Sequence, residues 1–186
     1  MPDTNLKIWT IGHFSHPLDD FAGLLTQHRI AALMDVRRFP GSRTFPQFNR
    51  ESLGASLAEL GIDYRWIEAL GGRRPRSIAA SPNEGWQNKS FRNYADHMLS
   101  EEFQAGFQEL IQCAIVKRTA IMCSESVYWR CHRRLISDYV VAQGGSVEHI
   151  FPDGRTKPHA MTEMAKIDSQ AAPTRITYPP APTLFD

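Results

Sequence analysis

The sequence has no apolar run long enough to cross a membrane, and its first residues lack the basic segment and apolar stretch of a signal peptide. It contains only three cysteines, an odd number that favours reduced thiols over a disulfide framework. We therefore expect a cytoplasmic protein without a membrane partner.

A strong charge of either sign is also missing, because the net charge of the 186 residues is only +1. Any preference for anions must therefore come from local clusters of basic residues. The hydrophobic content of 42% and charged content of 22% are those of an ordinary globular domain. We expect one domain over residues 1–155 and a disordered tail over residues 156–186, where apolar periodicity gives way to Pro, Ala, Thr and Ser.

Strand and helix patterns alternate along the first 151 residues. Apolar or alternating runs predict strands, and apolar positions at helical spacing predict the helices between them. The strands are expected at residues 7–13, 30–36, 62–67, 119–123 and 146–151, and the helices near 15–25, 50–60, 94–114 and 131–143. The fold class predicted is α/β, with a mostly parallel sheet of about five strands, helices on both faces, and a flexible C-terminal tail.

Chemically capable side chains follow several of these strands. His13 follows the first strand, Asp35 ends the second, Cys123 ends the fourth, and Glu125 follows it, before a helix that begins near His132. Ligands of open α/β sheets bind at the carboxyl ends of the strands. We therefore expect these five residues to form a catalytic site at one edge of the sheet.

Five short blocks of the sequence resemble signature blocks of the DUF488 family, across residues 7 to 151. The blocks are Thr10-Ile-Gly-His13, Asp35-Val-Arg37 with the Pro40/Ser42 loop, Leu70-Gly-Gly72, Met122-Cys-Ser-Glu125 and Cys131-His-Arg133. Phe14 departs from the pattern, because many members have serine directly after the histidine, whereas here it is Ser15. The family name records an unknown function, and some relatives are labelled DNA-repair proteins.

The carboxylates Asp35 and Glu125 suggest acid–base chemistry. Two carboxylates in a partly desolvated cleft can differ in pKa, so that one serves as base or nucleophile and the other as acid. His13 or His132 would then carry a proton. The alternative is structural, with Asp35 paired to Arg37 or Arg133 and Glu125 capping the following helix.

The cysteines allow three hypotheses. A thiolate at a strand-to-helix turn resembles cysteine phosphatases, but Arg130 lies one residue too far from Cys123 for their Cys-x5-Arg loop. Cys123, Cys131, His132 and His13 form a possible zinc or iron set, although the sequence has no Cys-x2-Cys pair. Cys123 can also be an inert buried thiol. We therefore predict no cofactor and keep zinc or iron as an alternative.

Arginines cluster after three strands, next to aromatic residues of the same loops. Guanidinium groups bind phosphate and aromatic rings stack on bases, so this composition favours a nucleotide or nucleic-acid ligand. The alternative is a solvated arginine rim with the aromatics packed inward. The expected phosphate- or substrate-binding residues are Arg37, Ser42, Arg43, Gly71, Gly72, Arg73, Arg130, Cys131 and Arg133.

The last residues suggest a further partner. Thr183, Leu184 and Phe185 resemble the end of the short peptides that bind the bacterial sliding clamp, although Ala181 occupies the position of their usual glutamine.

The leading hypothesis is a hydrolytic enzyme of nucleotides or nucleic acid, in DNA repair or modification. The first alternative is a non-catalytic module that binds nucleic acid or the clamp. The second is a metal- or thiol-dependent redox or sulfur enzyme.

Overall fold

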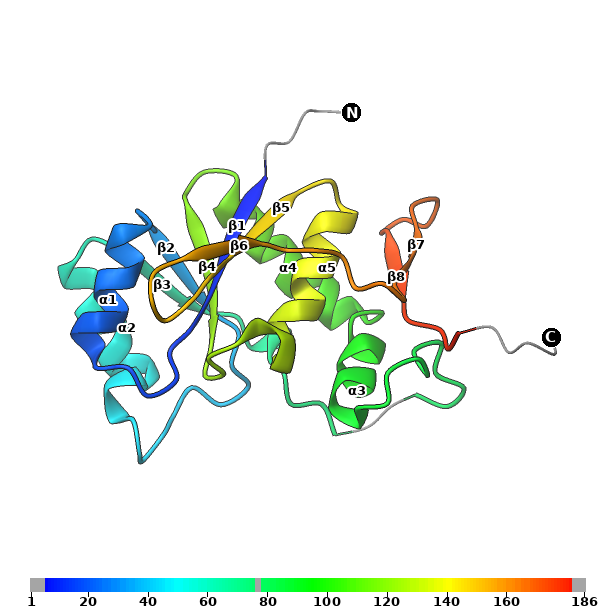
Figure 1. Ribbon diagram of the computed structural model, residues 1–186, viewed down its shortest axis with the longest axis horizontal. Coiled ribbons are helices and arrows are strands. Elements are labelled where there is room, and N and C mark those ends of the chain that lie inside the picture. The colour runs from blue at the N-terminus through cyan, green and yellow to red at the C-terminus, as the bar shows by residue number, and fades with distance from the viewer. Residues whose placement is uncertain (1–5, 76–77, 182–186) are drawn as a thin grey trace.

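The computed structural model describes residues 6–75 and 78–181, and within them most of the chain forms one α/β domain (Figure 1). Its main sheet has six strands in the order β3-β2-β4-β1-β5-β6. The strands are β1 (Lys7–Gly12), β2 (Ala32–Asp35), β3 (Asp63–Trp66), β4 (Thr119–Cys123), β5 (Ser146–Ile150) and β6 (Thr156–Pro158). The first five are parallel and β6 is antiparallel to β5, which confirms the predicted fold class.

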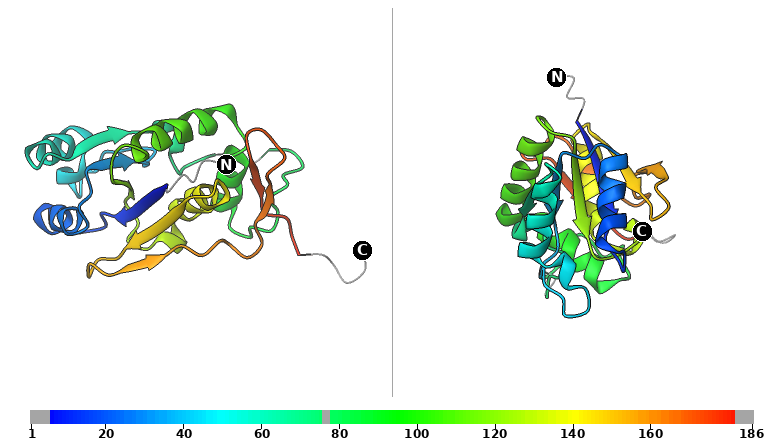
Figure 2. Two further views of the ribbon diagram at one scale, coloured as in Figure 1. Left: turned by 90° about the horizontal axis from the view of Figure 1, so that it is seen from above. Right: turned by 90° about the vertical axis from the view of Figure 1, so that its left-hand side faces the viewer.

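Helices cover both faces of this sheet. The helices are α1 (Leu18–Gln27), α2 (Arg50–Glu59), α3 (Lys89–His97), α4 (Glu101–Ala114) and α5 (Arg133–Ala142). Apolar residues of α1 and α2 pack in one cluster with Ile11, Leu33 and Met122, whereas those of α3, α4 and α5 pack in another with Ile8 and Ile121. Figure 2 shows α1 and α4 on opposite sides of the strands.

The predicted long helix over residues 94–114 is two helices. Ser100 separates α3 from α4, and its hydroxyl accepts a hydrogen bond from the backbone N–H of Phe103. Glu101 and Glu102 then occupy the first turn of α4, where negative charge favours a helix N-terminus. A serine cap within an otherwise continuous apolar stripe therefore marks the break.

The connections that leave the sheet create a crevice. The chain passes from β1 and β2 to α1 and α2 on one face, whereas it passes from β4 to α5 on the other. Because β4 lies between β1 and β2, its outgoing loop diverges from those of both neighbours. Such divergence leaves room at the carboxyl ends of the strands, where ligands of α/β proteins bind.

The segment after residue 155 corrects our expectation of a disordered tail as far as residue 181. It adds β6 to the sheet and then forms an antiparallel pair of β7 (Lys166–Asp168) and β8 (Arg175–Thr177). This pair lies at the end of the molecule opposite to α1 and α2 (Figure 1). Residues 182–186, which include the clamp-like Thr183, Leu184 and Phe185, lie outside the described residues.

Buried polar contacts attach this segment to the domain. Tyr178 is fully buried and its hydroxyl donates to Asp138 of α5 at 2.9 Å. The other oxygen of Asp138 contacts His159 at 2.8 Å, and His159 in turn contacts His149 of β5 at 2.9 Å. The side chain of His159 is therefore part of a buried chain of hydrogen bonds. The described helices include none with the length and apolar character needed to span a bilayer.

Candidate functional site

A pocket of about 380 Å³ lies at the carboxyl ends of β1, β2 and β4. Its lining combines residues that follow β1, β2, β3 and β4, as expected for the crevice between diverging loops. The lining residues are His13, Phe14, Arg37, Arg38, Phe39, Gly41, Ser42, Phe45, Arg73, Cys123, Ser124 and Glu125.

Asp35 is fully buried and its carboxylate is occupied by internal partners. One oxygen accepts hydrogen bonds from the backbone N–H and Nε of Arg37, at 3.0 and 2.9 Å. The other accepts from Nη2 of Arg37 at 2.5 Å and from the hydroxyl of Tyr64 at 2.6 Å. Burial opposes the charge of Arg37, but its hydrogen bonds to Asp35 raise the pKa of the guanidinium. Asp35 therefore holds Arg37 in place and has no free edge for catalysis.

His13 is also held by internal contacts. Its Nδ1 lies 2.8 Å from the carbonyl oxygen of Phe14 and its Nε2 lies 3.2 Å from Nη1 of Arg37, while its ring stacks on Phe48. A carbonyl can only accept, so Nδ1 carries the proton and Nε2 accepts from Arg37. Burial lowers the pKa of His13 to about 4, and the charge of Arg37 acts in the same direction. We refer to Asp35, Arg37, Tyr64 and His13 as the closed network.

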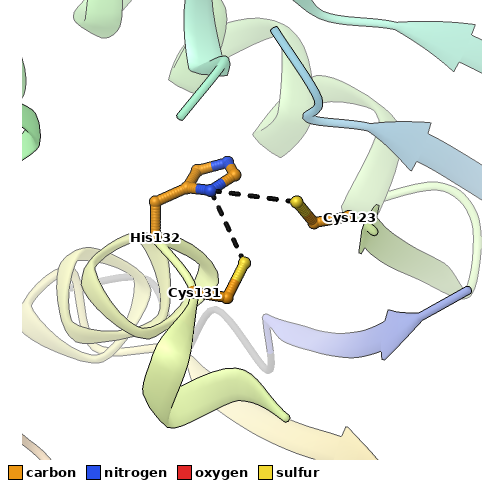
Figure 3. A group of neighbouring side chains, drawn as sticks. All are labelled: Cys123, Cys131 and His132. Atoms are coloured by element: carbon orange, nitrogen blue, oxygen red, sulfur yellow. Dashed lines mark hydrogen bonds between the residues drawn. The ribbon is translucent and has the colours of Figure 1, made fainter. Parts of the chain in front are cut away.

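Cys123, Cys131 and His132 form a second buried group, which we call the thiol cluster (Figure 3). Cys123 ends β4, whereas Cys131 and His132 directly precede α5. The Nδ1 atom of His132 lies 4.0 Å from Sγ of Cys123 and 3.5 Å from Sγ of Cys131. The three potential ligand atoms all lie within 4.8 Å of one another. The cluster thus gathers two sulfurs and an imidazole nitrogen at a single point.

The two thiols differ in acidity. Burial would raise the pKa of Cys131, but a hydrogen bond from Cys123 and the charge of Arg133 lower it to about 6. The same hydrogen bond, together with burial, raises the pKa of Cys123 to about 12. Arg133 is itself buried and donates from Nε to Sγ of Cys131 at 3.4 Å. The more acidic thiol is therefore the one further from the pocket lining.

Two glycines allow the backbone to approach these groups. A Cβ atom on Gly12 would lie 1.9 Å from the carbonyl oxygen of Glu125, so only glycine lets the ends of β1 and β4 meet closely. A Cβ atom on Gly72 would lie 2.3 Å from Nδ1 of His132. Gly72 therefore packs directly against the imidazole and restricts its position.

The rim of the pocket is basic and aromatic. Arg38 forms ion pairs with Glu68 and Glu102, at 3.3 and 3.9 Å, which offset part of its charge. Arg73 is exposed and makes no hydrogen bond or ion pair with another described residue. Phe39 is 67% exposed beside them. A second pocket of about 530 Å³ shares Arg38, Phe39 and Arg73 and extends toward Arg74, so the two form adjoining hollows.

Glu125 and Ser42 complete the pocket lining. The carboxylate of Glu125 is exposed, and it forms no hydrogen bond or ion pair within the described part of the chain. The hydroxyl of Ser42 accepts from the backbone N–H of Phe45 at 3.1 Å and so shapes the loop after β2. Glu125 is therefore available for chemistry in a way that Asp35 is not.

The remaining predicted residues have mixed placements. Gly71 packs against the backbone of Arg38, and Arg133 is buried, with Nη2 donating to the carbonyl oxygen of Glu125 at 2.5 Å. Arg43 and Arg130 are exposed and contribute to neither of the two pockets described above. The structure therefore brings Arg37 and Arg73 to the pocket, and leaves Arg43, Arg130 and Arg133 outside it.

Sequence reasoning missed three contributors to the site. Tyr64 holds Asp35, Phe48 stacks on His13, and the carbonyl oxygen of Val36 contacts Nε2 of His132 at 2.8 Å. Tyr64 lies between the charged Asp63 and Arg65 and shares its side of the strand with Ile62 and Trp66, which was a signal that it faces the interior. The carbonyl contact leaves no signal in the sequence, because every residue has the same backbone acceptor.

Residues 17–140 match the family described as "Domain of unknown function DUF488". No curated protein and no solved structure matches the chain at a significant level. The matched segment covers α1 through most of α5. It contains the whole thiol cluster, and it contains every member of the closed network apart from His13. The protein belongs to the DUF488 family.

Proposed function

We propose that this protein is an enzyme that acts on a nucleotide or on a nucleic-acid segment bound in the pocket at the carboxyl ends of β1, β2 and β4. The observation that carries the proposal is the rim, where Arg73, which has no hydrogen-bond or ion-pair partner among the described residues, lies beside Phe39 over a pocket of about 380 Å³. That volume lies within the range that holds small-molecule ligands. Arginine suits phosphate and an exposed aromatic ring suits a base.

In this proposal the charged groups have separate roles. Arg73 contacts phosphate, whereas Arg37, which the buried carboxylate of Asp35 holds in place, contributes positive charge to the wall of the pocket. Glu125 is the general base, because its carboxylate is exposed at the pocket and has no partner within the described residues. The reaction class that suits one base and a bound phosphate ester or glycosidic bond is hydrolysis.

Binding is tested with fluorescently labelled single-stranded oligonucleotides and with nucleoside mono- and diphosphates, at low and moderate salt. Arg73→Ala is expected to weaken binding by about tenfold, which corresponds to about 1.4 kcal/mol. The slope of log affinity against log salt concentration should also become shallower by about one unit, as expected for the loss of one phosphate contact. Arg43→Ala is the matched control, because Arg43 is an exposed arginine outside the pocket lining. Equal effects of the two variants would contradict the proposed ligand site.

Turnover is tested by incubating the same ligands with the protein and separating the products chromatographically. Glu125→Gln is expected to remove turnover while retaining binding, because the amide keeps the size of the side chain but cannot take a proton.

A non-catalytic binding module is the second candidate function. It is favoured by the closed network, which uses Asp35 and His13 for internal contacts and leaves them no catalytic role. Binding that depends on Arg73 but is never followed by product formation would favour this candidate over the enzyme.

A further inference from the structure

The thiol cluster adjoins the pocket through Cys123, and its two sulfurs and imidazole nitrogen are atoms that bind metal ions. Cys123 is 7% exposed and contributes to the pocket lining, whereas Cys131 and His132 are 3% and 8% exposed. The two sulfurs and the imidazole nitrogen come from the end of β4 and the start of the α5 region. Thiolate and imidazole together are the ligands that zinc prefers in proteins.

The hydrogen bond of His132 fixes which ring nitrogen is available. Its Nε2 lies 2.8 Å from the carbonyl oxygen of Val36, and this oxygen can only accept. Nε2 therefore carries the proton, and the lone pair of Nδ1 faces the two sulfurs (Figure 3). A hydrogen bond from the second ring nitrogen to a backbone carbonyl is the usual support of a metal-binding histidine.

The distances from Nδ1 of His132 to the two sulfurs are close to those in a tetrahedral zinc site. Bond lengths of about 2.3 Å to sulfur and about 2.0 Å to nitrogen place the nitrogen about 3.5 Å from each sulfur. The observed separations from Nδ1 are 3.5 Å for Cys131 and 4.0 Å for Cys123. Because Gly72 packs against the imidazole, the ring cannot easily turn away from this arrangement. The separation from Cys123 exceeds the tetrahedral value by only about half an ångström.

We propose that Cys123, Cys131 and His132 bind one zinc ion whose fourth position opens into the pocket. Three protein ligands with one open position are typical of catalytic rather than structural zinc. The fourth position is expected to face the pocket because Cys123, one of the three proposed ligands, also lines the pocket. Arg133 donates a hydrogen bond from Nε to the sulfur of Cys131 at 3.4 Å, and this bond orients the sulfur as a metal ligand.

A metal explains the geometry better than a nucleophilic thiol does. Cys131 is buried outside the described pocket lining, so a substrate in the pocket does not reach its sulfur. A disulfide would require the sulfurs to approach to about 2.05 Å, and it would leave the lone pair of His132 without a partner. The zinc site does not rest on the proposed nucleotide ligand, because neither Arg73 nor Glu125 is needed to hold the ion.

The test is metal analysis of the full chain, purified without an affinity tag and dialysed against dilute zinc. Wild type is expected to retain about one zinc per chain, as a single four-coordinate site requires. Cys131→Ser and His132→Ala should each lower the content at least about tenfold, while the matched control Cys113→Ser should leave it unchanged. Wild type with less than about a tenth of an equivalent of zinc or any other transition metal would overturn the proposal.

Cobalt substitution tests the ligand set even if a variant folds poorly. Wild type treated with a chelator and then with Co²⁺ is expected to show thiolate-to-cobalt charge transfer together with the intense visible bands of tetrahedral cobalt. Weak bands of octahedral cobalt without charge transfer would overturn the proposal. Zinc content and oligonucleotide binding are measured on the same preparation, so failure of either proposal is recognised separately.

Discussion

Asp35 of the closed network and Cys123 of the thiol cluster end the adjacent strands β2 and β4, yet the two groups use their polar atoms in different ways. In the closed network, Asp35 accepts from Arg37 and Tyr64, and His13 makes a contact with each ring nitrogen. In the thiol cluster, by contrast, the Nδ1 lone pair of His132 and both sulfurs face one another. A buried group of side chains whose polar atoms are all paired with one another stabilises the fold. A buried group whose nitrogen and sulfur lone pairs converge on one point is suited to binding a ligand there.

The largest expected effect comes from breaking the closed network. Asp35→Ala leaves the buried guanidinium of Arg37 without its counter-ion, and we expect the free energy of unfolding to fall by about 3–5 kcal/mol. Urea denaturation provides the measurement. Asp63→Ala is the control, because Asp63 pairs with Lys117 at the surface and should cost at most about 1 kcal/mol. Similar losses in both variants would mean that the network is not a stabilising unit.

A second variant breaks the thiol cluster instead. Gly72→Ala places a Cβ atom against the imidazole of His132, and we expect it to cost about 2–3 kcal/mol through overpacking. It should also remove most of the bound zinc, because the imidazole must move. Gly23→Ala is the control, since a Cβ there meets nothing within 4 Å in the helix α1 and should stabilise slightly. Unchanged zinc content in Gly72→Ala would show that Gly72 is not needed to hold His132 in its metal-binding position.

The pH dependence of stability tests whether buried histidines are held neutral. Burial and the neighbouring His159 lower the pKa of His149 to about 3, whereas an unfolded histidine takes up a proton near pH 6.5. Between these values the unfolded chain binds more protons, so stability falls as the pH falls. We expect His149 to account for a loss of about 2 kcal/mol between pH 6.5 and 5.

The control for this pH dependence is substitution at two histidines. His149→Gln should flatten the stability profile over that range, although His13, with its pKa of about 4, retains a similar slope of its own. The double variant His13→Gln/His149→Gln should lose most of the slope that remains. A wild-type profile that is flat from pH 6.5 to 5 would contradict the neutral state of both buried rings.

The smallest effect is expected at the edge of the closed network. Tyr64→Phe removes one hydrogen bond to Asp35 but leaves its pairing with Arg37, so we expect a loss of about 1 kcal/mol in urea denaturation. Zinc content should not change, because Tyr64 does not belong to the thiol cluster. A loss as large as that of Asp35→Ala would show that the hydroxyl, rather than the guanidinium, holds the carboxylate.

Local sequence patterns located most of the site but did not rank its residues. Asp35 and Glu125 each follow an apolar strand, so their surroundings in the sequence look alike. The difference between them arises because Arg37 folds back on Asp35 and Tyr64 reaches it from β3. These partners depend on side-chain direction and strand order, and hydrophobic periodicity reports neither.

The C-terminal segment was predicted poorly for a related reason. The strands β6, β7 and β8 have only three residues each and are mostly exposed, so they show no usable alternation. The segment is held in place by residues that are distant in the sequence. Asp138 and Asn83, for example, accept hydrogen bonds from the hydroxyl and the backbone N–H of Tyr178, which directly follows β8. Composition rich in Pro, Ala and Thr resembles that of disordered chains, and it contains no information about such contacts.

The sequence by itself determined the α/β class, the parallel core strands and the edge at which polar residues gather, because these follow from periodicity and from residues next to each other in the chain. Only the tertiary structure decided which groups are paired and which remain available. Pairing depends on distances between residues far apart in the chain, such as the 2.8 Å from His132 to the carbonyl oxygen of Val36. That contact turns the lone pair of His132 toward two sulfurs and makes an ordinary buried histidine a candidate metal ligand.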